Sequence, residues 1–243
     1  MMTSKGPTGP LFKWFGSKWT AAKKYPSPEP HAFLFEPYAG SAGYSLRHWD
    51  RVVTLYDTNP HLQILWPWLI AEATNTAVRE IPVGIPEGTD IRSLGLSEGQ
   101  AELLRCWQRT NNTGDCWTVS SWGHLPGQWT ENTRARVADE IQYVKHWTFE
   151  RINYGVVGTY FIDPPYQYNY KYGSPEVDYS WLGMQIQALE IAGCQVIACE
   201  AVCPKTGSVP SWLPFQPFGS FVTSRRKAHN NHHSKELMYH AIG

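Results

Sequence analysis

The sequence has no excess of charge of either sign: 21 lysines and arginines balance 21 aspartates and glutamates over 243 residues. This balance argues against a histone-like or tail-driven nucleic-acid binder, which needs a large basic excess. Long apolar runs are also absent and the mean hydropathy is −0.40, so no membrane-spanning helix is expected. No charged and then apolar leader opens the chain, which favours a cytoplasmic protein over a secreted one.

The cysteine pattern fits neither a set of disulfide bonds nor a zinc site. The five cysteines are an odd number and include no Cys-x-x-Cys pair. We therefore expect neither a disulfide framework nor a zinc site, and no metal elsewhere in the protein. Cys194 and Cys199 lie in and beside an apolar run and are interpreted as small core residues. Free thiols of this kind suit a reducing cytoplasm.

Tryptophan, by contrast, is abundant: the chain has 12. Hydrophobic residues make up 42% of the sequence, which is enough to bury a core. The length fits one large domain, or a core domain with a small insert. We find no internal repeat, and we expect a monomer or a weak dimer.

The first third of the chain carries the pattern of a parallel α/β unit, in which strands and helices alternate. Each apolar run is short and is followed by turn residues, which is typical of buried strands. In order, the pattern predicts a strand over 32–35, a glycine turn over 36–43, a helix over 44–49, a strand over 51–56 that ends at Asp57, and a helix over 61–74.

The remaining chain continues the alternation after a less regular stretch, so the fold class expected is α/β, with a doubly wound and mostly parallel sheet. The stretch 203–220 is rich in proline and is predicted to be a loop. Thr130 or Asn132 is the expected N-cap of the helix that follows them. The further elements predicted are helices over 101–109, 133–145 and 181–192, and strands over 149–154, 158–162, 195–201 and 236–242.

The glycine turn predicts a cofactor site. In a doubly wound sheet it lies at the carboxyl edge, where ligands bind, and Gly40 and Gly43 permit close approach of a ligand. Asp57 ends the next strand, where a carboxylate can bind a ribose diol; it could also be a turn residue only. Glu36 would repel a pyrophosphate but suits a cation, so the pattern favours S-adenosylmethionine over a nicotinamide dinucleotide.

The tetrapeptide Asp163-Pro164-Pro165-Tyr166 follows another predicted strand. Two prolines fix the backbone and remove two N–H donors, so the carbonyls of Asp163 and Pro164 project from a stiff chain. The Asp163 carboxylate adds an acceptor and Tyr166 adds an aromatic face. Such a group suits a planar base with an exocyclic amino group, because fixed acceptors can take both amino protons.

With these blocks in view, the chain resembles the amino-group DNA methyltransferases, specifically the adenine-N6 family of the Dam-like (D12) class. Three blocks carry the resemblance in that family's order, and Asp57 matches the acid after the second strand. The blocks are Leu11-Phe12-Lys13-Trp14-Phe15-Gly16-Ser17-Lys18, Phe35-Glu36-Pro37-Tyr38-Ala39-Gly40-Ser41-Ala42-Gly43 and Asp163-Pro164-Pro165-Tyr166.

The resemblance implies a site-specific enzyme that moves a methyl group from S-adenosylmethionine to the amino group of an adenine flipped out of DNA. It implies that the catalytic residues are Asp163, Pro164, Pro165 and Tyr166. It implies that the cofactor contacts Trp14, Gly16, Lys18, Glu36, Pro37, Tyr38, Ala39, Gly40, Ser41, Gly43, Asp57, Asn59, Asn153 and Tyr154. At Asn153 the family often has an acid, so the sequence departs from its pattern there.

Target recognition is expected in residues 76–130, inserted into a catalytic domain that comprises residues 1–75 and 131–243. Because the net charge is zero, contact with DNA must come from local basic patches. Asparagine and arginine side chains can also read base edges. The DNA-binding residues predicted are Arg105, Arg109, Asn111, Asn112, Arg225, Arg226 and Lys227.

Three other functions stay open at this point. Cytosine-N4 methylation is the nearest, although such enzymes more often carry serine where this chain has Asp163. A non-catalytic DNA-binding relative and a nicotinamide-dependent oxidoreductase are the others. A compact enzyme without a nuclease domain would suit a bacterial or phage-infected cell, as an orphan, phage-protection or restriction-modification methyltransferase.

Overall fold

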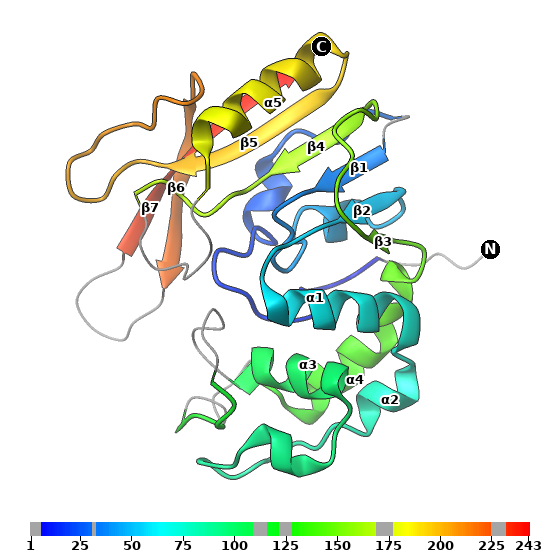
Figure 1. Cartoon of the computed structure of the whole chain (residues 1–243). Helices are drawn as coiled ribbons and strands as arrows, with labels where there is room; N and C mark the ends of the chain where they lie inside the picture. Colours follow the sequence, from blue (N-terminus) through cyan, green and yellow to red (C-terminus); the bar gives the residue numbers. More distant parts are fainter. Residues whose placement is uncertain (1–5, 31–32, 109–115, 122–127, 169–176, 225–231) are drawn as a thin grey trace.

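The computed structural model describes residues 6–30, 33–108, 116–121, 128–168, 177–224 and 232–243. Its centre is a seven-stranded sheet (Figure 1) with the order β3-β2-β1-β4-β5-β7-β6. The strands are β1 (Phe33–Glu36), β2 (Val53–Leu55), β3 (Thr148–Phe149), β4 (Gly158–Ile162), β5 (Gln195–Ala201), β6 (Gln216–Ser224) and β7 (His232–Ile242).

The first five strands are parallel, whereas β7 runs antiparallel to both of its neighbours. β1 lies between β2 and β4, with Leu34 opposite both Val53 and Thr159. The carboxyl ends of β1, β2 and β4 therefore meet at one edge of the sheet, which confirms the predicted α/β class and its mostly parallel sheet.

Helices lie on both sides of the sheet (Figure 1). One side carries α5, which packs on β5, and α1, α2, α3 and α4 form a group on the other side, where α1 packs against α3 and α2 against α4. No helix in the described ranges is both long and apolar enough to cross a membrane. The bounds are α1 (Pro60–Pro67), α2 (Asn75–Arg79), α3 (Glu98–Gln108), α4 (Glu131–Glu140) and α5 (Tyr179–Ile191).

Capping residues set most helix boundaries. Asn59 accepts a hydrogen bond from the His61 N–H and is followed by proline at the first helical position of α1, a favourable start. Thr130 caps α4 in the same way, as predicted, and Asp178 caps α5. After α5 the chain turns at Gly193, whose φ is +83°, the left-handed conformation that glycine adopts most readily.

Two hydrophobic clusters cover the two faces of the sheet. Alternate residues of β4 divide between them, with Phe161 in one cluster and Tyr160 and Ile162 in the other, as a period of two requires. The larger cluster also contains Ile91 and Leu103, so part of the predicted insert 76–130 shares the core of the sheet. Cys194 and Cys199 are buried, as predicted.

Several predicted boundaries were wrong. The helix expected over 61–74 is an α-helix only as far as Pro67, and a π-helical turn over Trp68–Glu72 follows it. A proline removes a backbone donor and crowds the preceding turn, which disfavours a regular α-helix at this point. The strand expected over 149–154 stops at Phe149. The loop expected over 203–220 contains the start of β6, an edge strand that accommodates Pro217 through an irregular register.

Candidate functional site

A pocket opens at the carboxyl edge of the sheet, where β1, β2 and β4 end. The three sequence blocks and the acid after β2 come together here, although they are far apart in the chain. Asp163 and Asp57, which end β4 and β2, lie on the same pocket. Its lining is Trp14, Phe15, Gly16, Ser17, Lys18, Glu36, Tyr38, Ala39, Gly40, Ser41, Gly43, Asp57, Thr58, Asn59, Phe161, Asp163, Pro165 and Val177.

The glycine turn is held at Gly40 from two sides. Its N–H donates to Asp57 Oδ2 at 3.0 Å and its carbonyl accepts from Trp66 Nε1 at 2.9 Å. The other Asp57 oxygen accepts from the Asn59 N–H at 2.9 Å. Burial raises the pKa of Asp57 while these backbone donors lower it. The carboxylate therefore both shapes the turn and ends in the pocket.

Glu36 ends β1 inside the pocket and is only 2% exposed. Its Oε1 accepts from the backbone N–H of Ser45 at 2.6 Å. Burial raises the pKa of Glu36 to about 8, and the hydrogen bonds from Ser45 oppose that shift only in part. Burial therefore favours the uncharged form of this side chain, whereas a cation beside it would favour the carboxylate.

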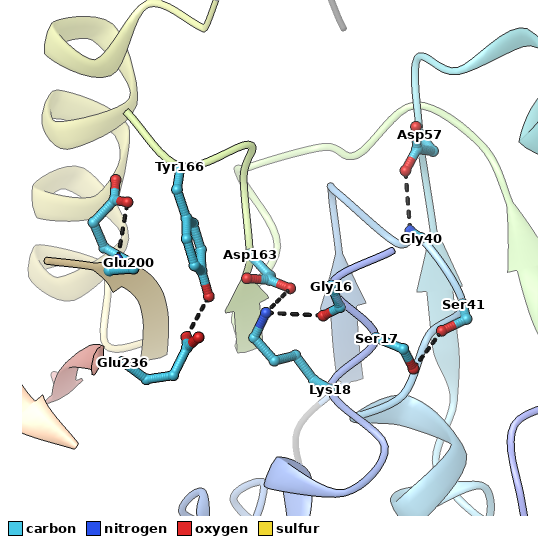
Figure 2. A network of polar contacts seen from close by, with 11 residues as sticks. Gly16, Ser17, Lys18, Gly40, Ser41, Asp57, Asp163, Tyr166, Glu200 and Glu236 are labelled. Atoms are coloured by element: carbon cyan, nitrogen blue, oxygen red, sulfur yellow. Dashed lines mark hydrogen bonds and ion pairs between the residues drawn. The ribbon is translucent and has the colours of Figure 1, made fainter. Parts of the chain in front are cut away.

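Asp163 is paired with a lysine from the N-terminal block (Figure 2). Lys18 Nζ lies 2.7 Å from Asp163 Oδ2 and donates to the Gly16 carbonyl at 3.0 Å. The second oxygen, Asp163 Oδ1, is buried and accepts no hydrogen bond of normal geometry from the residues described, although the Tyr166 hydroxyl is near enough to lower the pKa of Asp163. Burial raises the pKa of Asp163, and the charge of Lys18 is the largest effect that lowers it. Within the described ranges, Asp163 Oδ1 is thus a buried acceptor atom that receives no hydrogen bond of normal geometry.

Tyr166 is 7% exposed, and its hydroxyl donates to Glu236 Oε2 at 2.5 Å (Figure 2). Lys18 Nζ lies 5.0 Å from the centre of the Tyr166 ring, within the range of a cation–π contact. The Pro165 carbonyl accepts from the Tyr179 hydroxyl. These contacts hold Pro165 and the ring of Tyr166 next to Asp163.

Two acids in this region were missed by the sequence analysis. Glu200, near the end of β5, is fully buried and accepts from the Gln167 N–H at 3.3 Å and from Trp212 Nε1 at 3.1 Å. Burial raises the pKa of Glu200 to about 7. Glu236 lies on β7. A glutamate at the end of an otherwise apolar strand is a signal that could have singled out Glu200, whereas Glu236 carries no such signal.

Five predicted site residues do not line the pocket. One of them, Tyr166, lies next to the lining residue Lys18. Pro37 and Pro164 are buried in the adjoining backbone. The exposed Asn153 accepts from the Gly155 N–H at 3.0 Å and shapes a turn. Tyr154 stacks on Tyr160, with ring centres 5.8 Å apart. The structure therefore places Asn153 and Tyr154 in the loop before β4, outside the pocket.

Of the predicted DNA-binding residues, the structure describes Arg105, and its position contradicts the prediction. Arg105 was expected to bind DNA, but it is fully buried and its Nε lies 2.7 Å from Glu102 Oε2. Glu102 also contacts His61 Nδ1 at 2.7 Å, so Arg105 belongs to a buried charged network and cannot reach a phosphate. The others lie outside the described residues: Arg109, Asn111, Asn112, Arg225, Arg226 and Lys227.

The strand order, with five parallel strands and an antiparallel β7 inserted before β6, is that of the Rossmann-like fold typical of S-adenosylmethionine-dependent methyltransferases. No protein-family model matches the chain, and no curated protein sequence matches it. Among solved structures it is similar to the rRNA methyltransferase aviRa from Streptomyces viridochromogenes, with 12% identity, a TM-score of 0.42, and coverage of 96% of this chain and 88% of that one. A likeness at this level does not extend to a shared substrate or shared site residues.

Proposed function

We propose that this protein is an S-adenosylmethionine-dependent methyltransferase that acts on the exocyclic amino group of adenine in DNA. One observation carries the proposal. Asp163 heads a Pro-Pro turn at the end of β4, and one of its oxygens is buried with no hydrogen bond of normal geometry from the described part of the chain. It lies on the same pocket as the Gly40 turn and Asp57. A hydrogen-bond acceptor for an amino group and a turn suited to a nucleoside are thereby combined in one site.

The donors and acceptors in the pocket fit S-adenosylmethionine. An ionised carboxylate offers about four lone-pair positions; the backbone uses one on each oxygen of Asp57, which leaves capacity for ribose hydroxyls. Tyr38 supplies an aromatic wall and Glu36 a carboxyl group suited to a cation. When bound, the cofactor supplies a methyl group made electrophilic by a positively charged sulfur.

The residues after β4 would prepare the amino nitrogen. Asp163 Oδ1 and the Pro164 carbonyl would accept hydrogen bonds from its two N–H groups, which would make the nitrogen lone pair available for attack. The cofactor would supply the methyl group and leave as a neutral thioether, and the Asp163 carboxylate would take the proton that the methylated nitrogen loses. Tyr166, with its hydroxyl held by Glu236, offers the ring against which a flipped base would lie.

Glu36 predicts a pH dependence of cofactor binding. The free protein keeps Glu36 protonated below about pH 8, and a cation beside it favours the carboxylate, so binding releases a proton. The Kd for S-adenosylmethionine should therefore fall as the pH rises from 6 to 8, by up to about tenfold per pH unit. Calorimetry in two buffers of different ionisation enthalpy measures the released proton, and Glu36→Gln should abolish both effects. A Kd that is flat across this range in the wild type would contradict the prediction.

Gly40→Ala should weaken cofactor binding by at least about tenfold, or ~1.4 kcal/mol. Gly40 has a φ of +48°, and an added Cβ would lie 2.9 Å from Trp14 Cδ1. A non-glycine residue in this conformation costs about 1–2 kcal/mol, and here the tryptophan or the turn must also move.

Gly84→Ala is the matched control, because Gly84 has a φ of +68° with nothing within 4 Å of an added Cβ. Both variants should lose stability in urea, but only Gly40→Ala should lose affinity in calorimetry. Equal affinities would show that the turn does not contact the cofactor.

The substrate is tested by transfer of a labelled methyl group to duplex DNA and to RNA of the same sequence. The proposal expects label in DNA. Label in RNA alone would support a methyltransferase but contradict DNA as its substrate. Binding of a nicotinamide cofactor without binding of S-adenosylmethionine would contradict the assignment as a methyltransferase. Residues 76–130, with Arg109, Asn111 and Asn112, remain the proposed target-recognition region, and Arg225, Arg226 and Lys227 remain proposed phosphate contacts.

A further inference from the structure

Lys18 is buried against the acid at the end of β4. It is 7% exposed and its ammonium group spans Asp163 Oδ2 and the Gly16 carbonyl. The sequence resemblance assigned Lys18 to the cofactor contacts, and the structure places its Nζ on Asp163. A buried ammonium group is costly unless it is paired, and the carboxylate of Asp163 compensates the burial of Lys18.

Among the described residues, no other group around Asp163 supplies a compensating positive charge. Burial and the nearby Glu236 raise the pKa of Asp163, whereas Lys18 and, to a smaller extent, the Tyr166 hydroxyl lower it. The other titratable groups that interact with Asp163 are carboxyls, phenols or a thiol: Tyr25, Glu36, Tyr166, Cys199, Glu200 and Glu236. Without Lys18, these surroundings favour the protonated acid.

We infer that Lys18 is a positioning residue that keeps Asp163 ionised and occupies Oδ2, so that Oδ1 remains available as the acceptor for the substrate amino group. This inference rests on the proposed function and names the residue that prepares its catalytic acid. A protonated Asp163 would present an O–H donor to an amino group that itself donates, and the hydrogen bond that activates the nitrogen would be lost.

The first test measures Asp163 directly, without cofactor or substrate. Carboxyl-carbon NMR of protein labelled at aspartate gives the titration midpoint of Asp163, which is assigned by its absence in Asp163→Asn. Lys18→Met should move the midpoint to higher pH by at least about one unit, because a partner charge at this distance has effects of that size. Lys18→Gln, which retains donors but not the charge, should move it similarly, and Lys18→Arg should restore it.

Lys13→Met is the matched control in the same sequence block. Lys13 is also partly buried, and its Nζ donates to Gln128 Oε1 at 2.7 Å. It lies over Trp107 and not at Asp163. Loss of this lysine should leave the Asp163 midpoint unchanged. Circular dichroism on each variant establishes that the fold is retained.

The second test uses the pH profile of methyl transfer. In Lys18→Met the acidic limb of kcat should move to higher pH, in the same direction as the NMR midpoint, while the KM for S-adenosylmethionine stays within a few-fold. Raising the pH should recover part of the lost kcat. If Lys18 bound the cofactor instead, its loss would raise the KM for S-adenosylmethionine and leave the acidic limb of kcat at the same pH.

The outcomes separate this inference from the proposed function. An Asp163 midpoint that does not move in either Lys18→Met or Lys18→Gln overturns the inference, whatever the activity. A moved midpoint in a protein that transfers no methyl group supports the ion pair and rejects the proposed function. A rise in cofactor KM with no change in midpoint assigns Lys18 to the cofactor instead.

Discussion

Asp163→Asn is expected to lower kcat for methyl transfer by about 10²–10⁴-fold, the range for a residue that manages a proton in the transition state. The amide matches the carboxylate in shape but cannot take the proton, and half of it is a donor where an acceptor is required. The Kd for S-adenosylmethionine should stay within a few-fold, because Asp57, Glu36 and the glycine turn are untouched. Single-turnover kinetics and calorimetry measure the two quantities separately.

Stability needs a control here, because Asp163→Asn also removes the counterion of the buried Lys18. The double variant Asp163→Asn/Lys18→Met removes both charges and should regain most of any stability lost by the single variant, while remaining inactive. If Asp163→Asn retains full activity, the assignment of Asp163 is wrong. If the double variant regains activity, stability and not chemistry explains the loss.

Arg105→Leu is expected to lower the free energy of unfolding by about 3–5 kcal/mol, the usual cost of leaving one member of a buried ion pair without its partner. Arg105 and Glu102 are 0% and 1% exposed, and they join α3 to His61 on α1. Urea denaturation measures the loss. Glu102→Leu/Arg105→Leu should recover part of it, because apolar residues of similar volume often replace buried ion pairs well.

The same variant separates the structural role of Arg105 from the DNA contact that its sequence context suggested. Each phosphate contact contributes about one unit to the slope of the logarithm of the binding constant against the logarithm of the salt concentration. Arg105→Leu, measured at a temperature where it is folded, should leave that slope unchanged. A smaller slope together with unchanged stability would restore Arg105 to the nucleic-acid surface.

The parts of the site that could be predicted share one physical basis. Parallel strands place their carboxyl ends at one edge, so residues directly after predicted strands, such as Glu36, Asp57 and Asp163, come together without any further information. The N-terminal block could be placed there only through its resemblance to a family. Its close contact, between Lys18 and Asp163, connects residues far apart in sequence and carries no local pattern.

The parts that failed depend on tertiary packing. Arginine is a residue type usually exposed on helices, and only the packing of α3 against α1 shows that Arg105 is buried. Glu236 gains its role because β7 enters the sheet between β5 and β6, next to the loop after β4. The early end of β3 and the start of β6 in a proline-rich stretch likewise depend on pairing with distant strands.

The most direct measurement is the identity of the methylated nucleoside. Unmodified duplex DNA is incubated with S-adenosylmethionine and wild-type protein, or with Asp163→Asn as the matched negative control, and is then digested for mass spectrometry of its nucleosides. We expect N6-methyl-2′-deoxyadenosine with the wild type and a strong reduction with Asp163→Asn. N4-methylcytosine in its place, or no methylated nucleoside from a protein that binds the cofactor, would contradict the proposed function.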